Sequence, residues 1–395
     1  MSLSFALCSL LAGAAMLELP VAELDTLKGD RHKGKLAAIT SSGAMLQLDK
    51  GERSVPLIDI LELRFPAVRP AAAPATAGSI LVQLLDGSRI SCTAYRTASN
   101  QATLETPFGQ IKLPVASIQY VRFGGTSEKL EEAWKGIQER EIKKDTLVVR
   151  KKESDLLDHL GGVIGGIDDK IRFLLDGDEI PIAREKVFAL VYVRRAPIAA
   201  KALCRLHVAS GDILIASNLI WNGKAWTGTL TAGSDFTLAP EKLLSVDFSS
   251  GKVRYLSQMD PREIKYTPYI DAVWQHLSRD RNLHGGPLRL GNKTYTRGIS
   301  IHSRTFLRYR LAGDYSRFQA ILGIDSLVEG KGDVHFVLRG DGRVLHDAEV
   351  RGTDAPIPLD LDVSGVRDLE ILVDFGANQD DIADHLDLAD AKVIK

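Results

Sequence analysis

The sequence predicts a mainly β protein in which several small barrel-like repeats precede a C-terminal β-sandwich. Three observations support this fold class. Apolar residues recur at the same offsets several times within the first 250 residues. Apolar and charged residues alternate with strand spacing in the last 140 or so residues. Almost nothing in that last part has helical spacing, so an antiparallel sandwich is expected there.

Three copies of one apolar pattern lie in the first part of the chain, with members at offsets 0, +2, +7, +10 and +12. The copies are Ile111, Leu113, Ile118, Val121 and Phe123, then Ile180, Ile182, Val187, Leu190 and Tyr192, then Phe236, Leu238, Leu243, Val246 and Phe248. A partial fourth copy holds Ile60, Leu63 and Phe65, and Val55 fits it only if two residues are missing.

Each copy is expected to form a meander of about five short strands, because offsets of two are typical of strand alternation. Turn signals such as Asp86-Gly87 and Ser210-Gly211-Asp212 separate the strands. In size such a copy resembles a small SH3-like or Sm-like barrel. One set of strands this short makes a marginal core, so neighbouring copies should pack together.

Changes of composition predict where the parts of the chain begin and end. Residues 67–78 are rich in Ala and Pro and are expected to form a linker. Residues 125–144 carry Leu130, Trp134, Ile137 and Ile142 near helical spacing, which predicts a short helical connector. The four repeats are expected at residues 19–66, 79–124, 145–195 and 196–251, and the sandwich at residues 252–395.

Residues 1–18 are a candidate signal segment. The uncharged run from Phe5 to Ala15 ends in small residues, as secretory signals do, and is too short to cross about 30 Å of hydrocarbon. The positive residues that usually begin a signal are missing, so a buried first strand is the alternative reading. We expect an exported protein, located in the periplasm, at the cell surface or outside the cell.

The bulk composition argues against several classes of protein. The formal net charge is −1, which gives no general attraction to nucleic acid. Cys8, Cys92 and Cys204 have no spacing that would build a zinc site or a disulfide framework. No repeat shows a basic stripe interleaved with aromatic residues. The repeats are therefore expected to act as spacers or to dock protein partners.

Several motifs follow one another in the last part of the chain. They are Tyr255-Leu256-Ser257, Arg279-Asp280-Arg281, Gly285-Gly286-Pro287-Leu288, Tyr295 with Arg297 to Ser303, Gly323-Ile324-Asp325, Asp341-Gly342, and Asp384 to Ala391. On these motifs, residues 255–394 resemble the NPCBM family of carbohydrate-binding modules, which occur attached to glycoside hydrolases. The resemblance implies a galactose-binding-like jelly roll with a sugar-binding role.

One residue departs from the family pattern, since Leu388 stands where Trp is common. If position 388 lies in the core, this is a tolerable apolar exchange. If the family's ring is a stacking platform, its loss would weaken sugar binding.

Sugars are bound by apolar ring faces together with planar polar groups that replace water at the hydroxyls. The candidates of these types are Trp274, Arg279, Arg281, Arg297, His302, Arg304 and His385. Each has a structural alternative. Trp274 could belong to the rim or the core, His302 could hydrogen-bond internally, and the arginines could form a solvated rim.

Acidic residues near the C-terminus raise a question about metal binding. Asp380, Asp381, Asp384 and Asp387 are candidate calcium ligands, although their spacing lacks the alternation and glycine of an EF-hand loop. Alternatively, Asp384 and His385 hold the last strand by hydrogen bonds. No other cofactor is expected.

Charge is unevenly distributed within the predicted sandwich. Residues 279–317 sum to about +7 and residues 318–390 to about −12. Since both segments belong to one sandwich, cross-strand ion pairs between them are expected.

The sequence favours a noncatalytic carbohydrate-binding protein. A glycoside hydrolase is the second hypothesis, but it needs two carboxylates about 5 to 10 Å apart in a cleft, and no stretch remains for a catalytic domain. GxSxG, HExxH and phosphate-binding glycine loops are also missing from the sequence. The third hypothesis is a structural or adhesive protein whose sandwich no longer binds sugar.

Overall fold

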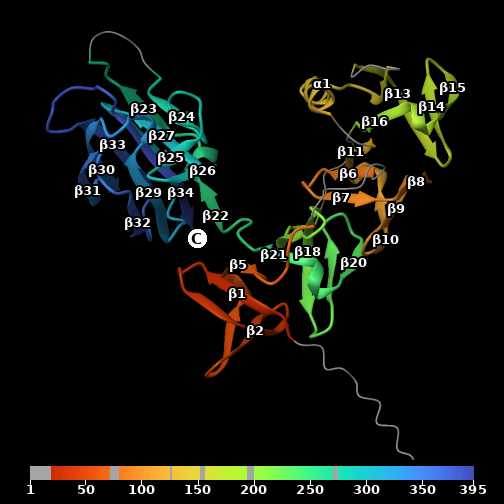
Figure 1. The fold of residues 1–395 in the computed structure, drawn as a ribbon, viewed down its shortest axis with the longest axis horizontal. Helices are drawn as coiled ribbons and strands as arrows, with labels where there is room; N and C mark the ends of the chain where they lie inside the picture. Colours follow the sequence, from red (N-terminus) through yellow and green to blue (C-terminus); the bar gives the residue numbers. More distant parts are fainter. Residues whose placement is uncertain (1–18, 72–79, 125–126, 152–155, 194–199, 270–274) are drawn as a thin grey trace, which may run out of the picture. The chain divides into compact units, whose positions relative to one another are not determined.

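The computed structural model describes residues 19–71, 80–124, 127–151, 156–193, 200–269 and 275–395. The candidate signal segment lies outside these residues. The chain divides into two compact units, residues 1–250 and 251–395. Strands dominate both units (Figure 1), so the predicted mainly β fold is confirmed.

The N-terminal unit consists of four strand meanders, each with a short 3-10 helix directly before its last strand. The first contains β1 (Val21–Thr26), β2 (Arg31–Ile39), β3 (Gly43–Leu48), β4 (Gly51–Pro56), η1 (Leu57–Asp59) and β5 (Ile60–Arg64). The second contains β6 (Ile80–Leu84), β7 (Arg89–Cys92), β8 (Ala94–Ala98), β9 (Gln101–Thr106), β10 (Gly109–Pro114), η2 (Val115–Ser117) and β11 (Ile118–Phe123).

The third and fourth meanders follow the same plan. The third contains β12 (Asp145–Arg150), β13 (Leu157–Ile167), β14 (Lys170–Leu175), β15 (Asp178–Ala183), η3 (Arg184–Lys186) and β16 (Val187–Val191). The fourth contains β17 (Cys204–Val208), β18 (Ile213–Trp221), β19 (Trp226–Leu230), β20 (Asp235–Leu238), η4 (Pro240–Lys242) and β21 (Leu243–Asp247).

The 3-10 helix explains the spacing of the sequence pattern. Offsets 0 and +2 fall on the strand before this helix, and offset +7 is the first residue of the last strand, as Ile118 shows. One turn of 3-10 helix between two strands therefore separates the two apolar pairs.

The fourth copy of the pattern needs a correction. Because Ile60 begins β5 at offset +7, Val55 occupies offset +2 and Arg53 occupies offset 0, with no residues missing. Val55 is buried and Arg53 is exposed. The pattern of the first repeat thus has the same spacing as that of the others, and it lacks only the first apolar residue.

The four meanders pack into one core, and their last strands pair with each other. β5 of the first pairs with β21 of the fourth, and β11 of the second pairs with β16 of the third, all antiparallel. Buried residues from all four meanders form one continuous apolar cluster, which includes Leu24, Leu104, Phe173 and Trp226. One short meander could not bury enough apolar surface by itself, and the four meanders together do.

The stretch expected to hold a helical connector contains α1 (Glu128–Gln138), whose N-terminus is capped by the Ser127 side chain. Leu130, Trp134 and Ile137 form its buried face and pack against Val148 and Phe188 of the third meander. Ile142 lies beyond the end of the helix.

The C-terminal unit is a sandwich of two antiparallel sheets. The first sheet has the order β24-β27-β34-β29-β32, with β22 on β34, and the second has the order β23-β28-β33-β30-β31. The strands of the first sheet are β22 (Val253–Tyr255), β24 (Leu277–Arg279), β27 (Gly298–His302), β29 (Arg317–Ile324), β32 (Ile357–Asp362) and β34 (His385–Ile394). Those of the second are β23 (Glu263–Tyr266), β28 (Thr305–Arg310), β30 (Asp333–Gly340), β31 (Arg343–Arg351) and β33 (Asp368–Phe375).

Three smaller elements complete this unit: a hairpin of β25 (Leu288–Leu290) and β26 (Lys293–Tyr295), and the 3-10 helices η5 (Leu256–Gln258) and η6 (Ser326–Val328). Alternate residues of the strands form the core between the sheets, among them Ile301, Leu322, Phe336 and Ile371. The predicted C-terminal β-sandwich is therefore present.

The expected ion pairs between the basic and acidic segments are confirmed. Arg308 pairs with Glu370 and Arg310 with Asp368 across β28 and β33. Arg317 pairs with Asp360 across β29 and β32. The uneven charge along the chain is thus neutralised within each sheet.

Candidate functional site

One end of the sandwich gathers the longest loops. We call it the loop end, and its described residues are 266–269, 275–276, 302–304, 325–332, 352–356 and 376–384. The strand registers bring these segments together, because His302 pairs with His385, Ile324 with Leu386, and Val334 with Phe375. The opposite end holds the pairing of Val253 with Ile394.

The candidate sugar-binding residues fall into two separate groups. His302, Arg304 and His385 lie at the loop end, where β27 ends and β34 begins. Arg297 directly precedes β27, so the five residues of this strand separate it from Arg304 by about 16 Å. The structure therefore does not unite the seven candidates in one site.

The arginines away from the loop end are engaged in contacts within the protein. Arg279 donates to Asp260 at 2.9 Å, and Arg297 donates to Asp280 at 2.9 Å. Arg281 donates to the main-chain oxygen of Gly285 at 3.2 Å. These bonds tie down the β24 edge, which is a structural role.

A row of aromatic and imidazole rings crosses the loop end. The ring centroids of His284 and His385 are 4.9 Å apart, and those of His385 and His302 are 6.0 Å apart. Tyr266 continues the row at 6.3 Å from His302 and stacks on His276 at 4.7 Å. We call these five residues the ring row. Its outer member His284 is exposed, whereas His302 is 7% exposed.

The two central histidines of the ring row are neutral at pH 7. Burial lowers the pKa of His302, and His276 lowers it further. Burial, together with the neighbouring imidazoles of His284 and His302, lowers the pKa of His385 to about 4. Neutral imidazoles offer one donor and one acceptor each, which suits hydroxyl groups.

Two carboxyl groups below the row are fully buried. Burial raises the pKa of Asp384 to about 7, although the main-chain N–H of Asp333 donates to it at 3.0 Å. Burial also raises the pKa of Asp387 well above its usual value, and this carboxyl lies beside Ser300 and Asp325. Burial thus disfavours the charged form of the Asp387 carboxyl within the sheet.

The four acidic calcium candidates are not brought together. In the part of the chain that the structure describes, no group of three or more His, Cys, Asp or Glu side chains could hold a metal ion. Asp380 accepts from Asn378 and from the main-chain N–H of Ile382, so it stabilises its own loop. Asp384 and Asp387 are buried under the row and are not available to an ion from solvent. The calcium assignment is corrected accordingly.

Arg304 lies at the rim of the loop end beside two aromatic side chains. Its guanidinium is 5.4 Å from the ring centroid of Phe375, and the exposed ring of Tyr269 meets Phe375 edge-on at 5.4 Å. A guanidinium next to ring faces combines the two kinds of group that sugar recognition uses.

Unfavourable backbone conformations are frequent in the same loops. Arg304, Glu329, Gln379 and Ala383 have φ values of 55°, 53°, 57° and 61°. Non-glycine residues rarely adopt this left-handed region, and such strain is often stored where ligands bind. The loop end is therefore the best candidate site of the C-terminal unit.

Two further sequence predictions concern aromatic positions. Trp274 lies outside the described residues. Leu388 is fully buried in the sandwich core and pairs with Ile299 and Leu322 on neighbouring strands. Position 388 thus belongs to the core, and the exchange of Trp for Leu removes no stacking platform there.

Sequence reasoning missed Tyr266, Tyr269, His276, His284 and Phe375 as members of this end. They come from four separate segments, and no spacing in the sequence links them. The one available signal was composition, because four of the nine histidines lie in the ring row.

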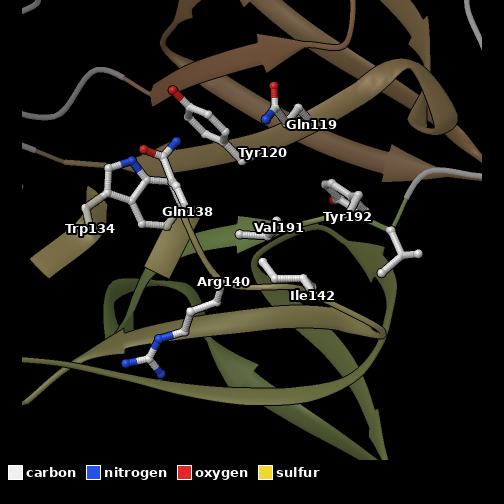
Figure 2. A pocket seen from close by; sticks show the side chains of 9 residues that line it. Gln119, Tyr120, Trp134, Gln138, Arg140, Ile142, Val191 and Tyr192 are labelled. Atoms are coloured by element: carbon white, nitrogen blue, oxygen red, sulfur yellow. The ribbon is translucent and has the colours of Figure 1, made fainter. Parts of the chain in front are cut away.

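The N-terminal unit contains a cavity of about 280 Å³ (Figure 2). Trp134 and Gln138 of α1 line it together with Tyr120 of β11 and Val191 of β16. It lies where the second and third meanders pair. None of the candidate sugar-binding or calcium-binding residues lines it. Within the described residues, we find no helix with the length and hydrophobicity that a bilayer crossing requires.

Residues 252–394 match the family model described as the NPCBM/NEW2 domain, which confirms the resemblance of the last 140 or so residues. A curated relative from Renibacterium salmoninarum, named "Putative endo-alpha-N-acetylgalactosaminidase", is 34% identical over 97 residues. These residues are 24% of this chain and 6% of the relative, so the chain covers a small part of that relative's length.

Similar solved structures contain CBM51 modules. The CBM51-2 and INT domains of Clostridium perfringens ZmpB, in complex with GlcNAc, are 24% identical and cover 43% of this chain and 36% of that chain, with a TM-score of 0.33. The CBM51 of Clostridium perfringens GH95, in complex with methyl-galactose, is 21% identical and covers 36% and 99%, with a TM-score of 0.33. The tandem CBM51 modules of Streptococcus pneumoniae Sp3GH98 are 11% identical and cover 63% and 88%, with a TM-score of 0.32.

Proposed function

We propose that the C-terminal unit, which matches the NPCBM/NEW2 domain model, binds glycans and does not cleave them. The family match is the observation that carries this proposal. The loop end supplies what such binding needs: exposed Tyr269 and half-buried Phe375 as ring faces, the Arg304 guanidinium, and neutral imidazoles.

We propose that the unit does not cleave glycans because the two carboxyl groups below the ring row, those of Asp384 and Asp387, are buried. A glycosidase needs two carboxyl groups that both reach the substrate. Asp384 has the raised pKa of a general acid, but its carboxyl is fully buried, and Asp387 is likewise 0% exposed. Neither of them reaches a bound sugar without a rearrangement of the last strand.

A glycan array probed with the full chain tests binding, and methyl galactoside and N-acetylglucosamine serve as first soluble probes. Arg304→Ala should weaken binding about tenfold, because a charge-assisted hydrogen bond to a ligand contributes about 1.5 kcal/mol. Arg343→Ala is the matched control, since Arg343 is exposed in the β30–β31 hairpin at the opposite end.

The outcomes separate the competing hypotheses. A blank array with and without calcium would reject glycan binding and favour a structural or adhesive protein. Turnover of chromogenic glycosides by the full chain would favour a glycoside hydrolase. Equal weakening by Arg304→Ala and Arg343→Ala would place the sugar elsewhere on the sandwich.

We further propose that the protein is exported and that the N-terminal unit serves as a spacer or docks protein partners. The uncharged run from Phe5 to Ala15 supports export, and N-terminal sequencing of the protein from the cell envelope tests it. The meanders support a spacer, because their open edges at β4 and β15 carry Pro56 and Pro181, which discourage strand addition. A sugar affinity that depends on substitutions in the meanders would contradict the spacer role.

A further inference from the structure

The inner half of the ring row holds the imidazoles of His302 and His385, and protonation to the charged form is unfavourable at both. The Nδ1 atoms of His302 and His385 are buried and have no hydrogen-bond partner among the described residues. A protonated imidazole needs acceptors for both nitrogens, and an unpaired buried charge is strongly destabilising. Both side chains therefore stay neutral only as long as the pH remains above their lowered pKa values.

The neighbours of these imidazoles do little to stabilise the doubly protonated, charged form. His385 of β34 faces His284 from the 280–287 loop, His302 from β27, and Asp325 after β29. Only the carboxylate of Asp325 favours the charged form there. The two imidazoles oppose it, because a cation on one histidine repels a cation on the next.

His302 has a similar environment. It faces Tyr266 from β23, His276 before β24 and Asp381 from the loop before β34. Burial and His276 disfavour the charged form, whereas a hydrogen bond to the main chain of Ser303 and the charge of Asp381 favour it, and the pKa of His302 is lowered on balance. Asp384 adds little compensation, because its pKa of about 7 means that its carboxyl already takes up a proton as the medium becomes acidic.

We propose that the glycan site at the loop end is acid-sensitive and binds its ligand only while His302 and His385 are both neutral. This inference rests on the proposed glycan-binding function. His302 leads directly into the turn that carries Arg304, and the main-chain oxygen of His385 accepts from Asp325 at 2.9 Å. An imidazolium that moves toward water therefore displaces both the arginine and the loop that precedes β34.

Isothermal titration of the full chain with methyl galactoside and N-acetylglucosamine between pH 7.5 and pH 3.5 tests the proposal. Affinity should fall at least about fourfold toward pH 3.5, because a group with a pKa of about 4 is then about three-quarters protonated in the free protein and the complex excludes that proton. Far-UV circular dichroism at each pH checks that the protein remains folded. An affinity constant within twofold over the whole range overturns the inference.

A second measurement uses the unaltered chain. The histidine Cε1–H signals, followed by NMR with and without saturating sugar, should show lower pKa values for His302 and His385 in the complex. His335 is the internal control, because it lies on the outer face of the other sheet and bonds Asp347 at 2.8 Å. Unchanged titration of His302 and His385 on binding contradicts the proposal.

Variants separate the two histidines from other acid effects. His385→Phe keeps a ring in the row and removes the titrating group, so the loss of affinity in acid should shrink. His335→Phe should leave the pH profile unchanged. If neither sugar nor any array glycan binds at pH 7.5, the proposed function and this inference both fail. Equal binding at all pH values rejects only the inference.

Discussion

The burial of Asp384 illustrates how single residues shape this sandwich. Its carboxyl is fully buried, and it accepts the main-chain N–H of Asp333, thereby joining the start of β30 to the start of β34. The charges of Asp380 and Asp381 lie close enough to disfavour ionisation further. Asp384 thus contributes a hydrogen bond to the fold, and its raised pKa makes the folded C-terminal unit less stable at high pH.

Asp384→Asn should stabilise the C-terminal unit at pH 8 and have little effect near pH 4. The folded carboxyl holds its proton up to about pH 7, whereas an unfolded one loses it near 3.8, so the wild type loses stability as the pH rises between these values. The difference in unfolding free energy should grow by on the order of 3 kcal/mol. Asparagine keeps the acceptor for Asp333, and urea denaturation at several pH values measures the effect.

Asp314→Asn is the control, since Asp314 is exposed on a turn. It should shift stability by less than about 0.5 kcal/mol at either pH. A variant Asp384→Asn that is destabilised more at pH 8 than at pH 4 would show that the carboxylate, rather than the acid, is the stable form.

Leu388 shows why a residue type alone does not reveal its role. From the sequence alone, Leu in place of Trp at position 388 is consistent with two roles: a sugar-stacking ring that has been lost, or a core position that has been repacked. The position faces inward because β34 alternates, so that Leu386 and Leu388 point to the core and His385 and Asp387 to the other face. The alternation was visible in the sequence, but which face meets the second sheet was not.

At the level of elements, equivalent turns of two repeats interlock. Asp212, in the turn before β18, accepts from the main-chain N–H of Ser91 and from the hydroxyl of Ser210, both at 2.7 Å. In return, the Ser88 hydroxyl of the second repeat accepts the main-chain N–H of Ile215 at 2.9 Å. Asp86 also bonds Thr231. The Gly-containing turns that mark each repeat thus join the second repeat to the fourth.

Asp212→Ala should destabilise the N-terminal unit by about 2 kcal/mol, because the main-chain N–H of Ser91 and the hydroxyl of Ser210 lose their buried acceptor. The first repeat supplies a matched control. Asp30 occupies the equivalent turn before β2 but is exposed, so Asp30→Ala should change stability by less than about 0.5 kcal/mol. Thermal unfolding followed by circular dichroism compares the two. Equal effects would mean that the interlock contributes nothing.

At the level of the whole molecule, the two units have separate apolar cores. Calorimetry of the full chain should therefore show two unfolding transitions. A sugar at about one hundred times its dissociation constant should raise only the transition of the C-terminal unit, by roughly 9 °C, as binding to the folded state adds about 2.7 kcal/mol. One cooperative transition, or a shift of both, would contradict independent units.

The sequence by itself determined the strand content, the four repeats and the sandwich, because these depend on local periodicity. Offsets such as Ile118 to Val121, and the alternation in β34, are properties of neighbouring residues. It also proposed His302, Arg304 and His385 as site residues, and the structure places all three at the loop end. Family motifs predicted a sugar-binding role for the last part of the chain.

Only the tertiary structure decided which of these residues act together. Arg297 and His302 were candidates for one sugar site by residue type, yet they lie at opposite ends of β27, and Arg297 bonds Asp280. Tyr266, His284 and Phe375 join His385 because strand registers align segments far apart in the chain. Residue types and spacing record the faces of single strands, whereas a site is created by the packing of many strands, which local sequence does not encode.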